Sequence, residues 1–269
     1  NPLSSDLGVM RQTLLFGGLE SIRRNINRKA ANLKFFEVGN TYKYEKEKWS
    51  EENPIKAYQQ EYHLALWITG KRVQGSWAHA DEESSFYELK ANVENILRRI
   101  GIAQNALTTE ASDNNIFDKA LTLKTRGGKT IVEMGILSHK LLKKMDIAQT
   151  VFYADIHWTN LMKAICKNKL QFQELSKYPS VSRDLALLLD SNIEFAQIEE
   201  IARQTEKKLL KKVELFDVYE GKNLPEGKKS YAVNFILQDE TKTLNDKAID
   251  AIMQKLIKNI TTKLGAELR

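Results

Sequence analysis

Residues 177–190 read KYPSVSRDLALLLD, a polar opening followed by an apolar run. Pro179 favours an extended conformation for the residue before it, and the two serines can bond to nearby backbone groups. Arg183 and Asp184 must be solvated or paired, because burying an unpaired charge costs several kcal/mol. The stretch therefore predicts a central strand over 184–190 that begins at its solvated end.

The residues around this strand read as one self-contained unit that begins near residue 176. A helix is predicted near 195–206, strands near 212–219 and 229–238, a helix over 246–263, and a short strand at the C-terminus. Asn245 can cap the long helix, and its apolar stripe is Ile249, Ile252, Met253, Leu256, Ile257 and Ile260. This βαββαβ order predicts a ferredoxin-like fold of the α+β class.

Alternation along the strands separates two sheet faces. Bulky residues belong beneath the two helices, including Leu187, Tyr231, Val233 and Phe235, and also Phe216 and Val218, which oppose Leu215. The other face collects Ala186, Asp217, Tyr219, Ser230, Ala232 and Asn234. Small residues let a planar ligand approach, tyrosine can stack, and Asp, Ser and Asn can bond to base edges. A base-binding face and a merely solvated face both fit this pattern.

The first 170 residues predict a mixed domain with a largely antiparallel sheet. Its expected elements are a helix carrying Leu15, Leu19, Ile22 and Ile26, strands over 33–44 and 62–69, a helix over 86–100 closed by Gly101, and a hairpin of 120–124 with 130–137. The chain thus predicts two domains, 1–170 and 171–269.

Composition excludes several classes of protein. The single cysteine, Cys166, cannot form an internal disulfide, and the spacing of the four histidines matches no metal-ligand pattern. We therefore expect a reducing, cytoplasmic setting, no metal site and no catalytic group. No apolar stretch is long enough for a membrane span, and the chain has neither a signal peptide nor an initiator methionine, so we expect part of a longer protein. The net charge of +6 supports RNA binding only weakly.

Four motifs in the second domain are specific: YPSVSRDLALLL, LFDVYEG, LPEGKKSYAV and ETKTLND. Through them this domain resembles the C-terminal anticodon-binding domain of bacterial phenylalanyl-tRNA synthetase β subunits. The first domain resembles the class II synthetase-like catalytic-type domain of the same subunit through NPLSSDLGVMRQTLL, KFFEVGNTY, FYELKANVENILRRIG and MGILSHKLL.

The resemblance implies a non-catalytic core domain followed by an anticodon-binding domain. Its implied partners are tRNA(Phe) and the α subunit of an α2β2 heterotetramer, with no membrane. ATP and Mg²⁺ would serve the whole enzyme through the α subunit, and no cofactor is expected in this chain. Lys43 and Tyr44 stand near the position where catalytic relatives carry one ATP-binding arginine. The segment around Gly135 lacks the second such arginine. Editing modules would precede Asn1.

The same resemblance implies roles for individual residues. The anticodon-binding residues would be Ala186, Asp217, Tyr219 and Ser230. Phosphate contacts are expected from Arg183, Lys222, Lys228 and Lys229. The apolar stripe of Leu15, Leu19, Ile22 and Ile26 would belong to the surface that packs on the α subunit. An alternative is a ferredoxin-like amino-acid-binding regulatory module, whose pocket would lie at a domain edge rather than across the sheet.

Overall fold

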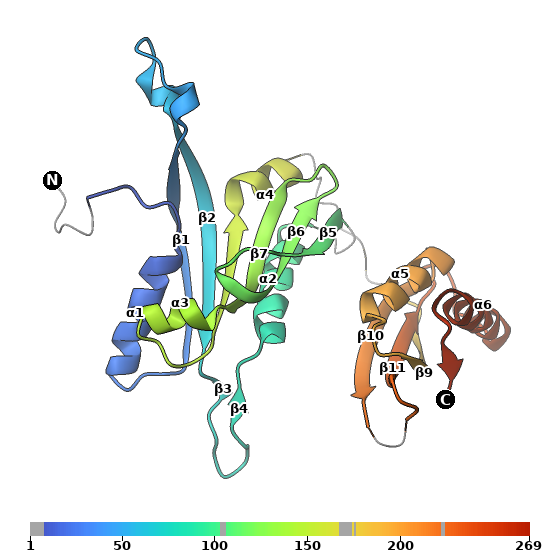
Figure 1. Cartoon of the computed structure of the whole chain (residues 1–269). Helices are drawn as coiled ribbons and strands as arrows, with labels where there is room; N and C mark the ends of the chain where they lie inside the picture. Colours follow the sequence, from blue (N-terminus) through green and yellow to red (C-terminus); the bar gives the residue numbers. More distant parts are fainter. Residues whose placement is uncertain (1–7, 103–105, 167–173, 175, 222–223) are drawn as a thin grey trace. The chain divides into compact units, whose positions relative to one another are not determined.

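The structure, a computed structural model, describes residues 8–102, 106–166, 174, 176–221 and 224–269 (Figure 1). The chain divides into two compact units, Asn1–Leu170 and Gln171–Arg269. Each unit has a sheet with helices packed on it and its own apolar core. The α+β class predicted from the sequence is therefore confirmed.

Unit 1 contains a six-stranded antiparallel sheet. The strands in spatial order are β1 (Leu33–Tyr44), β2 (Tyr58–Thr69), β8 (Val151–His157), β7 (Thr130–Leu137), β6 (Phe117–Thr125) and β5 (Leu107–Ala111). Figure 1 shows the β1–β2 ribbon extending beyond the rest of the sheet, with η2 (Lys46–Lys48) and η3 (Pro54–Ala57) at its tip. A second ribbon pairs β3 (Lys71–Val73) with β4 (Glu82–Glu83).

Helices cover both faces of this sheet. On one face, α1 (Leu15–Asn27) and α3 (His139–Lys144) share a core with Trp67 and Tyr153. On the other face, α2 (Phe86–Arg99) and α4 (Trp158–Ile165) pack over alternate residues of the same strands. A strand buried on both faces needs apolar residues at successive positions, which explains the continuous run LALWI in β2.

The apolar stripe of α1 is part of this core. Leu15, Leu19 and Ile22 are at most 1% exposed, and Ile26 packs against the same cluster. The prediction that this stripe faces the α subunit is therefore corrected, because in the folded unit it faces the sheet. Large apolar side chains are exposed instead on the edge strand β1, at Phe36 and Val38.

Unit 2 has the predicted βαββαβ order. Its elements are β9 (Val181–Asp190), α5 (Phe195–Thr205), β10 (Leu210–Tyr219), β11 (Lys228–Leu237), α6 (Asp246–Leu264) and β12 (Glu267–Leu268). The antiparallel sheet has the order β10-β11-β9-β12. This is the ferredoxin-like arrangement, and that prediction is confirmed.

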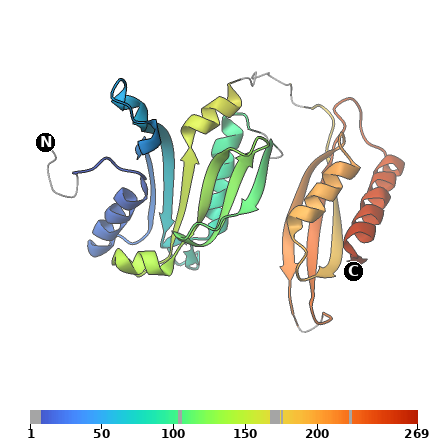
Figure 2. The ribbon, with the colours of Figure 1, turned by 45° about the horizontal axis from the view of Figure 1, so that its top comes forward.

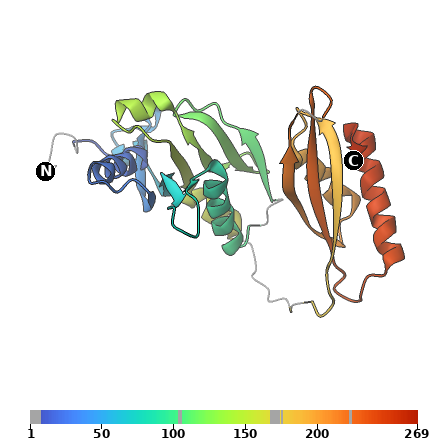
Figure 3. The same ribbon diagram turned by 90° about the horizontal axis from the view of Figure 1, so that it is seen from below.

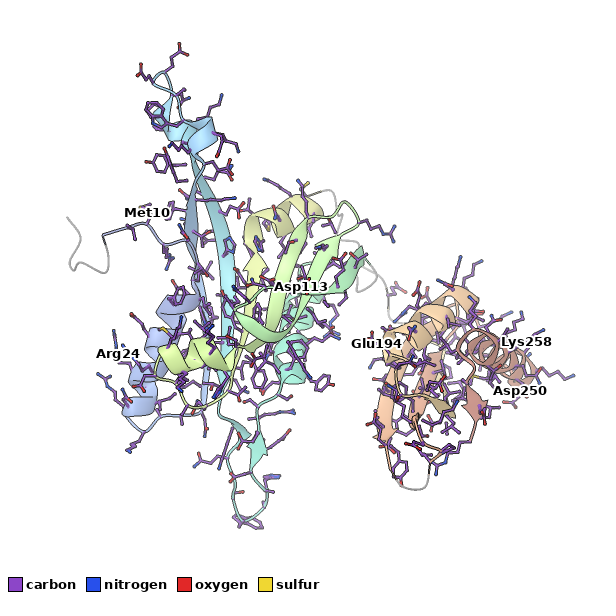
Figure 4. All side chains as sticks on the ribbon, viewed as in Figure 1. Met10, Arg24, Asp113, Glu194, Asp250 and Lys258 are labelled. Atoms are coloured by element: carbon purple, nitrogen blue, oxygen red, sulfur yellow. The ribbon has the colours of Figure 1, made fainter. Side chains whose placement is uncertain are left out.

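Both helices of unit 2 lie on the same sheet face (Figure 2). Seen from below, α6 runs along one side of the strands (Figure 3). The side chain of Asn245 accepts a hydrogen bond from the Ala248 backbone N–H at 2.9 Å, as the sequence predicts for a cap, and Gly265 closes the helix with φ of 63°. Figure 4 shows Asp250 and Lys258 on the outer side of α6, and both are exposed. Among the described residues of unit 2, no helix lies on the opposite sheet face.

Candidate nucleic-acid interface

Strand register brings the four predicted anticodon residues together on the helix-free face of unit 2. In β11, Ala232 lies opposite Ala186 of β9 on one side and Asp217 of β10 on the other. Two residues earlier, Ser230 lies opposite Tyr219. Because alternate strand residues point to the same face, these side chains form one continuous patch.

The patch is hollowed. A hollow of about 570 Å³ is lined by Ala186, Asp217, Tyr219, Ser230, Ala232 and Arg269. Two alanines form part of its floor, which leaves the sheet backbone accessible to a flat ligand. Tyr219 is 38% exposed, so a face or an edge of its ring is available for stacking.

Arg269 is the lining residue that the sequence analysis does not predict. Its backbone N–H donates to the Ala186 carbonyl at 3.1 Å, which continues the β12–β9 pairing to the last residue. Its guanidinium lies 5.6 Å from the centroid of the Tyr219 ring. The predicted C-terminal strand was the available signal, because a strand beside β9 delivers its next residue to the same patch as Ala186.

Gly221 allows Tyr219 its position. A Cβ atom added at Gly221 would lie 2.7 Å from the hydroxyl oxygen of Tyr219, closer than Cβ atoms normally approach another atom. The glycine thus leaves room for the tyrosine side chain to fold back over the end of β10. Any side chain at residue 221 would shift the ring that borders the hollow.

The predicted phosphate-contact residues are divided between the two sheet faces. Lys228 is at the end of β11 and forms an ion pair with Asp190 at 2.9 Å, and hydrogen bonding to Asp190 raises the pKa of this lysine. Lys229 is buried on the helix side, with its ammonium group 4.7 Å from the Tyr231 ring centroid. Arg183 also lies on the helix side, 3.8 Å from Asp246 at the start of α6. Lys222 lies outside the described residues.

A β-bulge in β10 changes the face of two residues. The register shifts between Leu215 and Asp217, so Phe216 has no direct partner in β11. Leu215 packs against the core, whereas Phe216 is 59% exposed and lines a second hollow with Asp184 and Asn234. The prediction that Phe216 lies beneath the helices is therefore wrong. Strict alternation cannot anticipate an extra residue, although it placed Asp217 and Tyr219 correctly.

The chemistry of the hollow suits bases better than phosphates. A carboxylate accepts hydrogen bonds, so Asp217 can receive the amino or imino N–H of a base and would repel phosphate. Arg269 supplies a cation beside an aromatic ring, an arrangement that can hold a stacked base. The hollow can therefore bind an unstacked base through stacking on the face of the base and hydrogen bonding to its edge.

Comparison with known families agrees with this arrangement. Residues 1–158 match the family described as "Phenylalanyl tRNA synthetase beta chain CLM domain". The chain belongs to the phenylalanyl-tRNA synthetase beta chain family. Residues 176–269 of this family member match the "Ferredoxin-fold anticodon binding domain". The resemblance found in the sequence motifs is thereby confirmed for both halves of the chain.

Curated relatives of this beta chain family member align along its whole length. It is 60% identical over 269 residues to the phenylalanine--tRNA ligase beta subunit of Bacteroides thetaiotaomicron and 50% identical to that of Porphyromonas gingivalis. In each case the alignment covers 100% of this chain and 33% of the relative. The chain thus spans about one third of the length of these relatives.

Among solved structures, the pyrrolysyl-tRNA synthetase of Desulfitobacterium hafniense matches with 13% identity and a TM-score of 0.40, covering 60% of this chain and 55% of that one.

Within the described residues, none of the helices is both long and apolar enough to cross a bilayer.

Proposed function

We propose that the hollow on unit 2 binds bases of the tRNA(Phe) anticodon, as part of a β subunit in a phenylalanine--tRNA ligase. The single observation that carries the proposal is the meeting of Ala186, Asp217, Tyr219 and Ser230 in one hollow. A stacking ring, a carboxylate acceptor, a hydroxyl and a small-residue floor are the groups that recognise unstacked bases. Arg269 joins them as a contact to a stacked base or to the phosphate beside it.

Unit 1 is proposed as a scaffold for the catalytic α subunit of an α2β2 assembly. Its edge strand β1 exposes Phe36 and Val38, and among the described strands β2 is its one neighbour in the sheet. An exposed edge strand with apolar side chains is a surface that partner chains commonly cover. This location replaces the stripe of α1, which is buried.

The ATP and Mg²⁺ used by such an enzyme are assigned to the α subunit, and the assembly is proposed to act in the cytoplasm. Two features of unit 1 support the assignment. Lys43, near the end of β1, points into solvent, and its Nζ atom lies 3.8 Å from Oε1 of Glu45. Gly135 has no space for a side chain, because an added Cβ atom would lie 2.4 Å from the Lys119 carbonyl oxygen. Neither position can supply an arginine to a nucleotide.

The test measures binding of tRNA(Phe) transcripts to the assembled enzyme, with native and altered anticodon bases. We expect Asp217→Ala to weaken binding of the native transcript and to reduce the preference over the altered ones, because one base loses its acceptor. A lost base contact is worth about 1–3 kcal/mol. Asp250→Ala is the matched control, since Asp250 is an exposed carboxylate on α6.

Unchanged affinity and unchanged preference in folded Asp217→Ala would exclude this residue from base recognition. The alternative of an amino-acid-binding module makes a separate prediction, namely that phenylalanine binds unit 2 in the absence of tRNA. Calorimetric titration of the chain with phenylalanine tests it directly.

A further inference from the structure

Four ionisable side chains gather on one face of the sheet of unit 1, whereas the proposed base-binding hollow belongs to unit 2. Glu61 and His63 alternate along β2, and Asp155 and His157 alternate along β8. His63 lies directly opposite His157 in the antiparallel register, so all four point to the same side of the sheet. The two sequence pairs are Glu-x-His and Asp-x-His, a pattern that the spacing of the histidines by themselves does not show.

His63 is held in one orientation. Its Nδ1 lies 2.7 Å from Oδ1 of Asp155, a contact that places the ring proton on Nδ1 and leaves the Nε2 lone pair free. The residue is 5% exposed, and its buried Nε2 atom has no hydrogen-bond partner among the residues that the structure describes. A buried histidine nitrogen without a partner lowers the stability of the fold by about 1–3 kcal/mol, so a ligand that binds this nitrogen would recover that free energy.

The free nitrogen faces two further ligand groups. The Nε2 atom of His63 lies 3.5 Å from Oε2 of Glu61, and Nδ1 of His157 lies 3.8 Å from the same oxygen. The two imidazole rings are 4.5 Å apart between centroids. One ligand atom from each of Glu61, His63 and His157 lies within 4.8 Å of the others.

We infer that Glu61, His63 and His157 form a binding site for a single Zn²⁺ ion, with Asp155 orienting His63. Two imidazoles and one carboxylate are a common zinc ligand set, with a fourth position left for water. Ligand atoms around tetrahedral zinc are separated by roughly 3.3 Å, so the distances of 3.5 and 3.8 Å from Glu61 to the two imidazoles need only a small closure. Glu61 can provide it, because its side chain is 48% exposed and free to turn.

The electrostatics fit a divalent cation. The charges of Glu61 and Asp155 together balance the two charges of the ion. The aspartate bonded to His63 Nδ1 corresponds to the carboxylate–histidine–zinc arrangement that fixes ligating imidazoles in zinc proteins. A nitrogen-rich set also favours Zn²⁺ over Mg²⁺, which prefers oxygen ligands.

The experiment is a calorimetric titration of Zn²⁺ into the EDTA-stripped chain in a Cys166→Ser background, since the exposed Cys166 thiol could bind zinc adventitiously. We expect one ion per chain. Glu61→Gln and His157→Gln should each weaken binding at least tenfold, and Asp155→Asn by 10–100-fold, the usual effect of removing an orienting partner. His79→Gln and His139→Gln, both at exposed histidines, are the controls.

Two further readouts keep the test decisive. Co²⁺ in place of Zn²⁺ should give the visible bands of a tetrahedral site, and these should be absent in Glu61→Gln. Zn²⁺ should also raise the Tm of the parent chain and not that of Glu61→Gln, a variant expected to fold because its side chain is partly exposed. Equal zinc affinity in the parent and in the folded double variant Glu61→Gln/His157→Gln would overturn the site. A parent chain that binds Zn²⁺ only at millimolar concentrations would overturn it as well.

Discussion

Tyr219 combines a proposed role in base binding with a small structural role. Its ring borders the hollow and lies near Arg269, and it is not a member of the apolar core of unit 2. Its placement depends on the absence of a side chain at Gly221. A substitution at residue 219 can therefore separate binding from stability.

We predict that Tyr219→Ala weakens tRNA(Phe) binding to the assembled enzyme by about 1–3 kcal/mol, because a stacking surface for a base is lost. Tyr219→Phe should retain most of the affinity. Val218→Ala is the control, since Val218 is comparably exposed at the neighbouring position and points to the other face. Fluorescence titration gives the affinity and thermal unfolding gives the stability. A lower Tm with unchanged affinity per folded molecule would mean that Tyr219 only covers the sheet end.

His63 gives unit 1 a pH-dependent contribution to stability. Burial lowers the pKa of His63, but the hydrogen bond and charge of Asp155, together with Glu61, outweigh burial and raise the pKa overall. Because the pKa of His63 is higher in the folded state, its contribution to stability is fully present below about pH 6.5, the pKa of histidine in an unfolded chain. This contribution is lost as the pH rises through the higher folded-state pKa.

We therefore predict that Asp155→Asn, in EDTA, reduces the free energy of unfolding more at pH 6 than at pH 8. His157 acts in the same direction, because Asp155 partly offsets the lowering of its pKa, and removing the charge lowers that pKa further. Urea unfolding of both proteins at the two pH values provides the measurement. An equal loss at pH 6 and pH 8 would contradict the coupling.

At the scale of single elements, α6 supplies much of the core of unit 2. Leu256 is fully buried at its centre, and Lys255 beside it is exposed. We predict that Leu256→Ala lowers the free energy of unfolding by about 2–5 kcal/mol, the range for truncating a buried leucine. Lys255→Ala should change it by less than about 0.5 kcal/mol. Urea denaturation followed by circular dichroism measures both, and a small effect at Leu256 would show that the core closes around the gap.

The edge strand β1 is the element proposed to meet the α subunit. We predict that Phe36→Asp or Val38→Asp reduces co-purification with the α subunit while the chain stays folded, because these side chains are 74% and 43% exposed and carry little of the core. Trp77→Asp is the control, at a fully exposed residue between β3 and β4. Normal assembly of both β1 variants would place the contact elsewhere on unit 1.

At the scale of the whole molecule, the two units divide the proposed work into partner binding and RNA binding. We predict that the chain alone gives no phenylalanine-dependent ATP–pyrophosphate exchange, since Lys43 and Gly135 cannot supply the arginines that hold a nucleotide. Addition of the α subunit should bring the exchange with it. A signal that stays with the purified chain through a second purification would contradict the non-catalytic assignment.

The sequence by itself predicted the elements whose signals are local. The apolar stripe and the Asn245 cap defined α6, and alternation placed Ala186, Asp217, Tyr219 and Ser230 on one face of unit 2. These features depend on the 3.6- and 2-residue periods of helix and strand, which a single segment displays without reference to its neighbours. The motifs carried the family resemblance because each of them is a contiguous stretch of sequence.

The tertiary structure alone decided the features that arise between segments. The bulge at Phe216 depends on the register with β11, the place of Arg269 depends on the pairing of β12 with β9, and the burial of the α1 stripe depends on which sheet face it covers. The meeting of Glu61, His63 and His157 likewise requires β2 and β8, 82 or more residues apart in sequence, to pair in one register. Register and packing are properties of pairs of elements, so no local period can report them.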